Sequence, residues 1–211
     1  MSPAAILGAS VRIHNQNLES LAFERLLFFS DAVFAIAITL LAIDIRLPAA
    51  HDGADLGRRI VSLTPQVVAY VVGFFQLAQF WIAHHQLFRH IVQFDSKLLW
   101  LNLLFLLLIA FLPVPTSALG ENGVSSVSVS FLASCLALTS LAELATWLHA
   151  SHGLIGKHVS ARARRGITIK IVIVAAVFAV SIAIAQFSPL AALLSWFLIW
   201  AGHAITDRRY H

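Results

Sequence analysis

The sequence predicts an all-α membrane protein with six transmembrane helices. Hydrophobic residues make up 59% of the 211 residues and charged residues only 11%, and the mean hydropathy is +0.85. A water-soluble domain of this length could not bury so much apolar surface, whereas apolar runs of about 20 residues match the hydrocarbon core of a bilayer. The expected spans cover residues 21–47, 64–88, 97–119, 124–149, 167–187 and 189–205. They form one domain over residues 1–211, because no boundary or strong repeat divides the chain.

Prolines mark the limits of several spans. The first span stops at Pro48, and the second begins beside Pro65, which suits the first turn of a helix. The third ends near Pro113 and Pro115. The fourth and fifth are apolar runs separated by a basic loop, and the sixth, the shortest, begins at Pro189. We therefore expect six helices joined by short polar connections.

The distribution of Lys and Arg predicts how the chain is oriented in the membrane. An even number of spans puts both termini on one side, and eleven of the fourteen Lys and Arg fall on that side. These are Arg12, Arg25, Arg89, Lys97, Lys157, Arg162, Arg164, Arg165, Lys170, Arg208 and Arg209, whereas Arg46, Arg58 and Arg59 fall on the other. Because Lys and Arg are enriched in cytoplasmic loops, we expect both termini in the cytoplasm.

Several other classes of protein find little support in the sequence. The single cysteine, Cys135, lies in an apolar stretch and allows no internal disulfide. Basic residues are not interleaved with aromatic residues on a polar face, so we expect no nucleic-acid partner. There are no paired carboxylates, metal-ligand spacings or nucleophiles with a positioned base, which argues against an enzyme. We also expect no cleavable signal peptide, since the first apolar run begins late and is too long.

Ser30, Asp31 and Thr39 interrupt the apolar run of the first span. A carboxylate at membrane depth is costly and by default marks a functional site. Arg25 lies about two helical turns from Asp31, although partners on other spans are equally open. We expect Ser30 and Asp31 to make helix-packing hydrogen bonds. The alternative is that Asp31 attracts cations at a pore mouth or carries protons.

Ile36, Leu40 and Ile43 share one face of the first span, at spacings of four and three residues. Such a stripe usually faces lipid or packs against another helix. Around a symmetry axis, the same side chains would form an apolar ring that narrows a pore and gates it by dewetting. Thr39 could then offer its hydroxyl to a passing ion, or it could bond back to a carbonyl one turn earlier.

The second span ends in the cluster formed by Trp81, His84 and His85. Adjacent histidines point to different sides of a helix and make a poor metal chelate, whereas Trp81 and His84 can share a face. The cluster is either an interfacial aromatic belt or part of a polar network with Arg25 and Asp31. The sequence leaves both readings open.

Polar groups also occur in the later spans. We expect Asn102 and Glu143 to lie inside the membrane, with Glu143 neutral or hydrogen-bonded. His149, His152 and His158 lie beside the basic stretch that begins at Lys157. We expect a solvated cytoplasmic loop there, and the alternative is a metal or anionic-lipid site.

Four motifs carry a family resemblance. The pattern Arg25-x-x-x-Phe29-Ser30-Asp31, followed by Ala-Val-Phe-Ala-Ile-Ala-Ile-Thr-Leu-Leu, resembles the first-helix signature of the transmembrane protein 175 family. These proteins are endosomal and lysosomal potassium channels and their bacterial relatives. The similarity continues in Trp81-Ile-Ala-His84-His85-x-Leu-Phe, Trp100-Leu-Asn102-Leu-Leu-Phe and Leu-Pro113-x-Pro115-Thr-Ser. It covers the first half closely and the second half only through span count and hydropathy.

The resemblance implies a homotetramer in which the first helix of each subunit lines a central pore. It implies a hydrophobic constriction at Ile36, Leu40 and Ile43 and a pore hydroxyl at Thr39. It also implies a structural polar network of Arg25, Phe29, Ser30, Asp31, Trp81 and either His84 or His85. The chain has no Thr-Val-Gly-Tyr-Gly-like loop to supply a carbonyl selectivity filter. Selectivity would therefore come from partial dehydration at a narrow apolar ring, which favours potassium over sodium.

We therefore expect a potassium-preferring cation channel in a bacterial inner membrane, with potassium as the permeant ion and no cofactor or bound metal. Its partners would be membrane lipid, monovalent cations and further copies of itself. The alternative is a secondary transporter coupled to protons or metal ions, using Asp31, Glu143 and the histidines. The mostly unbroken spans and the few acidic residues argue against a transporter.

Overall fold

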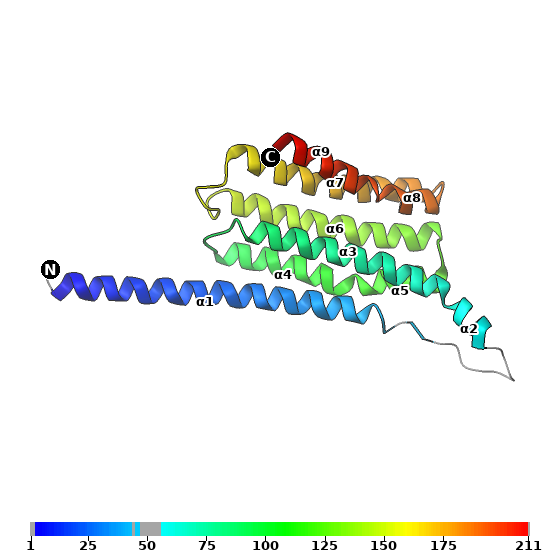
Figure 1. Cartoon of the computed structure of the whole chain (residues 1–211), viewed down its shortest axis with the longest axis horizontal. Helices are drawn as coiled ribbons and strands as arrows, with labels where there is room; N and C mark the ends of the chain where they lie inside the picture. Colours follow the sequence, from blue (N-terminus) through cyan, green and yellow to red (C-terminus); the bar gives the residue numbers. More distant parts are fainter. Residues whose placement is uncertain (1–2, 44, 47–55, 211) are drawn as a thin grey trace.

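The chain folds into a bundle of roughly parallel helices, with one long helix along its side (Figure 1). The computed structural model describes the backbone of residues 3–43, 45–46 and 56–210, and the side chains of residues 21–43, 45–46 and 56–206. The helices of this part of the chain are α1 (Pro3–Leu40), α2 (Leu56–Ser62), α3 (Thr64–Phe88), α4 (Ser96–Phe111), α5 (Pro113–Asn122), α6 (Ser126–Ser151), α7 (Ala161–Ala185), α8 (Pro189–Ser195) and α9 (Leu198–Tyr210).

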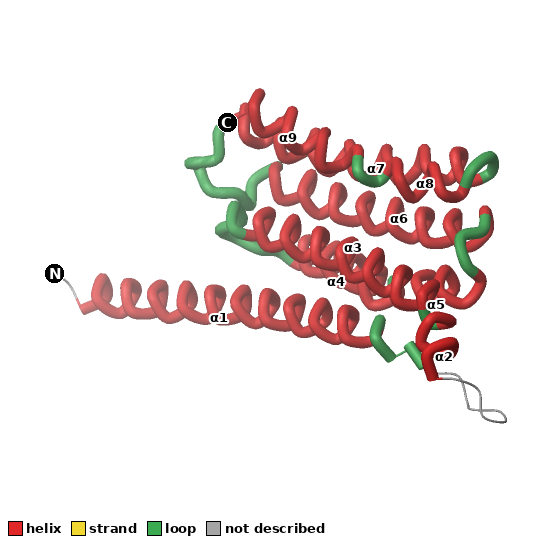
Figure 2. The backbone as a smooth tube through the Cα atoms, turned by 45° about the vertical axis from the view of Figure 1, so that its right-hand side comes forward, coloured by secondary structure: helices red, strands yellow, loops and turns green. Residues whose placement is uncertain are grey.

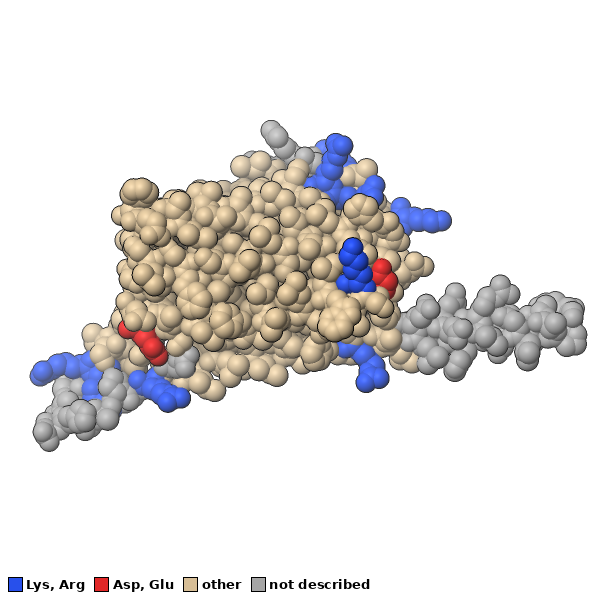
Figure 3. Space-filling model, turned by 180° about the vertical axis from the view of Figure 1, so that it is seen from behind, with Lys and Arg blue, Asp and Glu red and all other residues tan. Residues whose placement is uncertain are grey.

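Five helical segments of the described chain are long and apolar enough to cross a membrane. They are Thr64–Phe88, Ser96–Asn122, Ser126–Ser151, Ala161–Ala185 and Pro189–Thr206, and they overlap the second to sixth expected spans. In Figure 3, Lys and Arg gather at the two ends of the molecule and leave a broad uncharged surface between them. This charge distribution matches a bilayer with its polar surfaces at either end. The protein is therefore an integral membrane protein.

The first expected span differs from the structure at its end. α1 stops at Leu40, and hydrogen bonds of a tighter turn follow, such as that from Ile43 N to Leu40 O at 3.0 Å. The prediction that Ile43 continues the helix was therefore wrong, and Leu47 lies outside the described residues. The physical reason is local, because charged residues at positions 44 and 46 and then Pro48 follow the apolar run, and helices usually end before a proline.

α1 is also absent from the five spanning segments of the described chain. Its apolar part carries three charged residues, Glu24, Arg25 and Asp31, and charged side chains are costly inside a bilayer. A sixth span therefore stays a prediction. The two termini lie toward the same end of the molecule in both backbone views (Figures 1 and 2), as an even number of spans would require.

Most spans are unbroken, but the third and the sixth each contain a break. α4 ends at Phe111 and the chain continues as α5 from Pro113, which has no N–H to donate to the preceding turn. Pro113 does not end the span, because a first helical turn tolerates proline, and the segment runs on to Asn122. α8 and α9 are separated near Ser195, whose hydroxyl donates to Ala192 O at 2.6 Å and favours a bend.

α6 lies at the centre of the bundle. Figure 2 shows it between one layer formed by α7, α8 and α9 and another formed by α3, α4 and α5. Its sequence is rich in Ser, Ala and Thr, and small side chains let membrane helices approach closely. Ser125 and Ser128 form a capping box at the start of α6, in which each side-chain oxygen accepts from the backbone N–H of the other residue. These two N–H groups therefore have partners although they precede the first intrahelical hydrogen bonds. α6 thus provides a rigid core behind the helices that hold α1.

Candidate functional site

α1 has one packed face. Leu26, Ser30, Phe34, Ala37 and Leu41 are buried, at spacings of four, four, three and four residues. This is the period of an α-helix, and the face packs against α3 and α4. The sequence of α1 therefore fixes its rotation relative to the rest of the subunit.

A second face of α1, beside the packed one, is apolar and exposed. Ile36 is 59% exposed and Leu40 is 39% exposed, and Ile43, in the turn that follows, is 57% exposed. Phe29, about two helical turns before Ile36, is also exposed. Contiguous apolar surface of this kind needs a covering of lipid or protein. The residues predicted for a pore constriction are thus on the side of α1 that the subunit leaves uncovered.

Thr39 lies between Ile36 and Leu40 in this exposed region. Its hydroxyl donates a hydrogen bond to the carbonyl oxygen of Ile36 at 2.9 Å. The back-bonding considered from the sequence is therefore present. Because the hydrogen is used in this bond, the oxygen lone pairs remain to accept from water or to contact a cation.

A buried chain of hydrogen bonds holds the packed face of α1. Asn102 Nδ2 on α4 donates to Ser30 Oγ at 3.1 Å, and Ser30 Oγ donates to Leu26 O at 2.9 Å. Asn102 Oδ1 lies 2.8 Å from His84 Nε2 on α3. Since the amide nitrogen donates to Ser30, the amide oxygen accepts, and His84 Nε2 carries the proton. Ser30, His84 and Asn102 are all buried and link three helices.

Aromatic rings enclose His84. Its ring stacks on Phe105 with a centroid distance of 5.3 Å and on Phe88 at 4.3 Å. Phe34 of α1 lies against the same imidazole at 5.8 Å. This packing fixes the ring orientation, so His84 presents Nε2 to Asn102 in a single geometry.

Asp31 takes part in a separate, exposed contact. Trp81 Nε1 donates to Asp31 Oδ1 at 2.9 Å, and the exposed His85 stacks against Trp81 at a centroid distance of 5.8 Å. Arg25 is exposed and makes no ion pair with Asp31 in the described chain. The histidine in the buried chain is therefore His84, and the residues expected in one network form two groups within the subunit.

Asn102 is the residue that the predicted site omitted. It connects His84 to Ser30 across 18 and 72 residues of sequence. The available signal was its amide, the only side chain of that kind in the apolar helix α4. An amide at that depth requires partners, but its position in the sequence does not name them.

Glu143 is buried in α6, and its Oε1 has no hydrogen-bond partner among the described residues. It lies apart from Asp31, which is exposed on α1. The histidines expected near the basic loop do not gather either, since His149 bonds Asp95 at 2.9 Å and His152 bonds the carbonyl of Leu148. In the described part of the chain, no group of three His, Cys, Asp or Glu is arranged to hold a metal.

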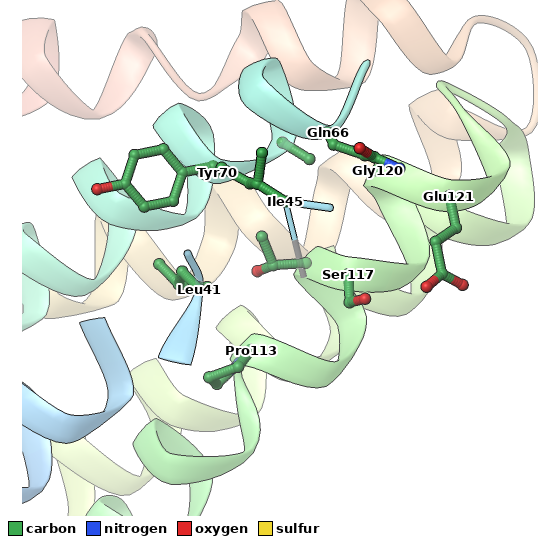
Figure 4. Close-up of a pocket in the computed structure, with 10 residues that line it drawn as sticks. Leu41, Ile45, Gln66, Tyr70, Pro113, Ser117, Gly120 and Glu121 are labelled. Carbon is green, nitrogen blue, oxygen red and sulfur yellow. The ribbon is translucent and has the colours of Figure 1, made fainter. Parts of the chain in front are cut away.

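A small cavity lies where the end of α1 meets α3 and α5 (Figure 4). Its volume is about 10 Å³, and it is lined by Leu41, Ile45, Gln66, Ala69, Tyr70, Pro113, Thr116, Ser117, Gly120 and Glu121. This is about the space of one water molecule. The cavity is too small for an organic ligand or a hydrated ion path.

Comparisons with known proteins agree on one family. The model of the endosomal/lysosomal potassium channel TMEM175 family matches residues 25–113. A potassium channel of Streptomyces collinus is 38% identical over 125 residues, which cover 57% of this chain and 61% of the relative. The endosomal/lysosomal proton channel TMEM175 of Homo sapiens is 33% identical over 141 residues, which cover 61% of this chain and 28% of the relative.

Solved structures show the same fold. The crystal structure of a lysosomal potassium-selective channel TMEM175 homolog from Chamaesiphon minutus superimposes with a TM-score of 0.77 at 25% identity, covering 88% of this chain and 98% of the other. The sequence match to a potassium channel of the same organism is 32% identical over 128 residues and covers 58% of this chain and 63% of the relative. The matched segments thus span about three fifths of the length of the bacterial relatives from Streptomyces and Chamaesiphon. Residues 25–113 thus match the model of the TMEM175 family of ion channels, and the chain has the fold of a TMEM175 homolog.

Proposed function

We propose that the protein is a potassium-preferring cation channel in which the first helices of four identical subunits surround a central pore. The observation that carries this proposal is the exposure of Ile36 on a part of the α1 surface that lies outside the packed face. One face of α1 is packed against the subunit and another exposes apolar side chains. Such a helix is suited to pack against the same helix of neighbouring subunits. Two bacterial relatives that match 57% and 58% of this chain are named potassium channels.

The constriction would consist of stacked apolar layers. Ile36 and Leu40 form rings inside the helical part of the pore, and Ile43 forms a further layer in the turn where the helix has ended. An apolar ring repels hydrated ions and admits those that shed part of their water at least cost. Potassium holds its water less tightly than sodium, so this barrier favours potassium without a carbonyl filter. The lone pairs of Thr39 contact the partly dehydrated ion.

The two groups of polar residues would act as clamps and not as ion ligands. Ser30 faces away from the proposed pore and is bonded through Asn102 to His84. Asp31 is held by Trp81 at the side of the helix. Together they hold the back of α1 against α3 and α4, which keeps Ile36 directed to the axis. Arg25, Phe29 and His85 are exposed in the subunit and would complete this framework at the subunit boundary.

The proposed subunit is a single six-span channel domain over residues 1–211 of a homotetramer in the inner membrane. Both termini lie in the cytoplasm, in agreement with their shared end of the bundle and with the eleven Lys and Arg assigned to that side. The purified protein should then have a mass of about four times 23.0 kDa once bound detergent is subtracted.

The proposal is tested by replacing Ile36 with Asn in protein reconstituted into planar bilayers. A polar ring removes the dewetting barrier, so we expect larger currents and a reversal potential in a potassium–sodium gradient that moves toward zero. Ile36→Leu keeps the ring apolar and serves as the control, with wild-type ion preference. If currents and reversal potentials of both variants equal those of the wild type, the pore is not at this face.

A transporter coupled to protons or metal ions is the second candidate, favoured by the buried Glu143 and by the broken third and sixth spans. It predicts saturable flux without discrete current steps, and loss of flux in Asp31→Asn. A channel predicts discrete steps that persist in Asp31→Asn, because the Asn side-chain oxygen still accepts from Trp81. Since some matching relatives are named proton channels, the same recordings in a pH gradient measure the proton share of the current.

A further inference from the structure

A groove opens between α6 and the beginning of α7. It has a volume of about 380 Å³ and is lined by Ser151, Ala161, Arg164, Arg165, Thr168 and Ile169. Ser151 ends α6, and the other residues belong to the first turns of α7. The groove therefore lies at one end of the helix bundle, at the level where the spanning helix α7 enters the membrane.

Two arginines and two hydroxyl-bearing residues give the groove a defined polar lining. Arg164 Nη1 donates to the carbonyl oxygen of Ser151 at 3.3 Å, which holds this guanidinium across the groove and leaves its other N–H groups to donate elsewhere. Arg165 is exposed beside it. Below them, Trp147 Nε1 donates to Thr168 Oγ1 at 3.0 Å and joins α6 to α7, so the floor is fixed.

The groove carries strong positive charge with no acidic side chain of its own. Residues 157–170 contain five Lys and Arg, and no Asp or Glu occurs anywhere between residues 144 and 206. Asp95, which reaches this end of the bundle, is already engaged by His149 Nε2 at 2.9 Å and by the backbone N–H of Leu98 at 2.7 Å. The groove therefore complements an anion, and paired guanidinium groups match the oxygens of a phosphate.

The position of the groove decides the kind of anion. α7 is one of the membrane-spanning segments, and Ile169 gives the groove an apolar wall toward the membrane interior. A phospholipid places its phosphate at this depth and its acyl chains along such a wall, and basic pockets between membrane helices are suited to anionic head groups. We propose that the groove binds the phosphate head group of an anionic membrane phospholipid. The proposal does not depend on ion conduction.

The test uses the full-length protein in detergent and native mass spectrometry with phosphatidylglycerol or phosphatidylcholine as the probe. We expect phosphatidylglycerol to bind more tightly than phosphatidylcholine. The double variant Arg164→Gln/Arg165→Gln should weaken phosphatidylglycerol binding about 30-fold, because each Lys or Arg near an anionic lipid contributes a factor of about five to the affinity. Arg164→Lys/Arg165→Lys keeps both charges and should retain most of the preference. Circular dichroism checks that each variant is folded.

Arg89→Gln/Lys97→Gln is the matched control, because it removes two exposed charges at the same end outside the groove. It should bind phosphatidylglycerol as the wild type does. Increasing salt should reduce the preference of the wild-type protein, which gives a readout that needs no variant. Equal binding of the two lipids, equal loss in the control, or displacement of the lipid by millimolar inorganic phosphate would each overturn a specific phospholipid site in the groove.

Discussion

At the scale of single residues, Asn102 has the greatest structural consequence. It is fully buried and contacts His84 on α3 and Ser30 on α1. No other hydrogen-bonded side chain of the described chain joins these three helices. Because a buried amide in a membrane must keep its partners, Asn102 favours one arrangement of α1 over others of similar apolar packing.

Asn102→Leu should lower the free energy of unfolding by about 1–2 kcal/mol, because His84 Nε2 loses its acceptor inside an apolar region. Thermal unfolding in detergent, followed by circular dichroism, measures the effect. Gln86→Leu is the control, since Gln86 is exposed on the neighbouring helix α3 and should leave stability unchanged. Equal melting temperatures for Asn102→Leu and the wild type would show that the amide is dispensable.

The sequence identified polar residues more readily than their partners. A carboxylate, an amide and two histidines stand out in apolar runs whatever the fold. The selection of His84 over His85 depends on which side of α3 is covered by Phe105 and Phe34, and both rings come from other helices. Ser30 and Asn102 likewise meet only because α1 and α4 pack together. Such pairings are long-range packing results that residue types alone do not determine.

At the scale of helices, Asp95 caps α4 and joins it to α6. Its carboxylate accepts from Leu98 N at 2.7 Å and from His149 Nε2 at 2.9 Å. The backbone N–H of Leu98, and next the His149 imidazole, hold the pKa of Asp95 below its usual value of 3.8. The ionised carboxylate therefore stabilises the folded state above about pH 4, and this contribution is lost as the pH falls through the lowered pKa.

Asp95→Asn should accordingly melt at a lower temperature than the wild type near pH 5, and the difference should shrink toward pH 3. Asn can still cap the helix, so the pH-dependent part reports the charge. Melting temperatures between pH 3 and pH 5 provide the measurement. If the difference in melting temperature between Asp95→Asn and the wild type stays constant over this range, the ionisation of Asp95 does not contribute to stability.

Gly73 sets the distance between α3 and α5. A Cβ added there would lie 2.6 Å from Thr116 Cγ2 and 3.3 Å from Leu41 Cδ2. Gly73→Ala should therefore destabilise the protein by about 1–3 kcal/mol through overpacking. Thr116→Ser removes the methyl group that collides, so Gly73→Ala/Thr116→Ser should regain part of the lost melting temperature. No recovery in the double variant would mean that the strain arises elsewhere.

Helix limits were predictable where local chemistry decides them. The expected second span and α3 share the same limits, 64 and 88, because Pro65 suits the first turn and charged residues follow the last. The end of α1 was placed too late because hydropathy continues through Leu41 and Ile43 after the helical hydrogen bonds have stopped. The break near Ser195 is not marked by a proline. It depends on the Ser195 hydroxyl, which donates to the carbonyl oxygen of Ala192 one turn earlier.

At the scale of the whole molecule, the subunit leaves α1 half covered. The packed face binds α3 and α4, while large apolar side chains such as Phe28, at 71% exposed, and Ile36 remain bare. In the proposed tetramer, the face that carries Ile36 meets its copies around the axis, and side chains on other exposed surfaces of the bundle face lipid. Exposure alone does not separate these two environments, so a probe that depends on several subunits is required.

A cysteine placed at the axis supplies such a probe. In Ile36→Cys, thiolates from neighbouring subunits would converge and bind Cd²⁺, because soft thiolates favour such metals. We expect micromolar Cd²⁺ to block the current of this variant and a chelator to restore it. Val180→Cys is the control, because Val180 is 57% exposed on α7, away from the proposed pore, and the native Cys135 is buried. Block of Val180→Cys but not of Ile36→Cys would place the conduction path elsewhere, since only an axial position brings one residue from each subunit together.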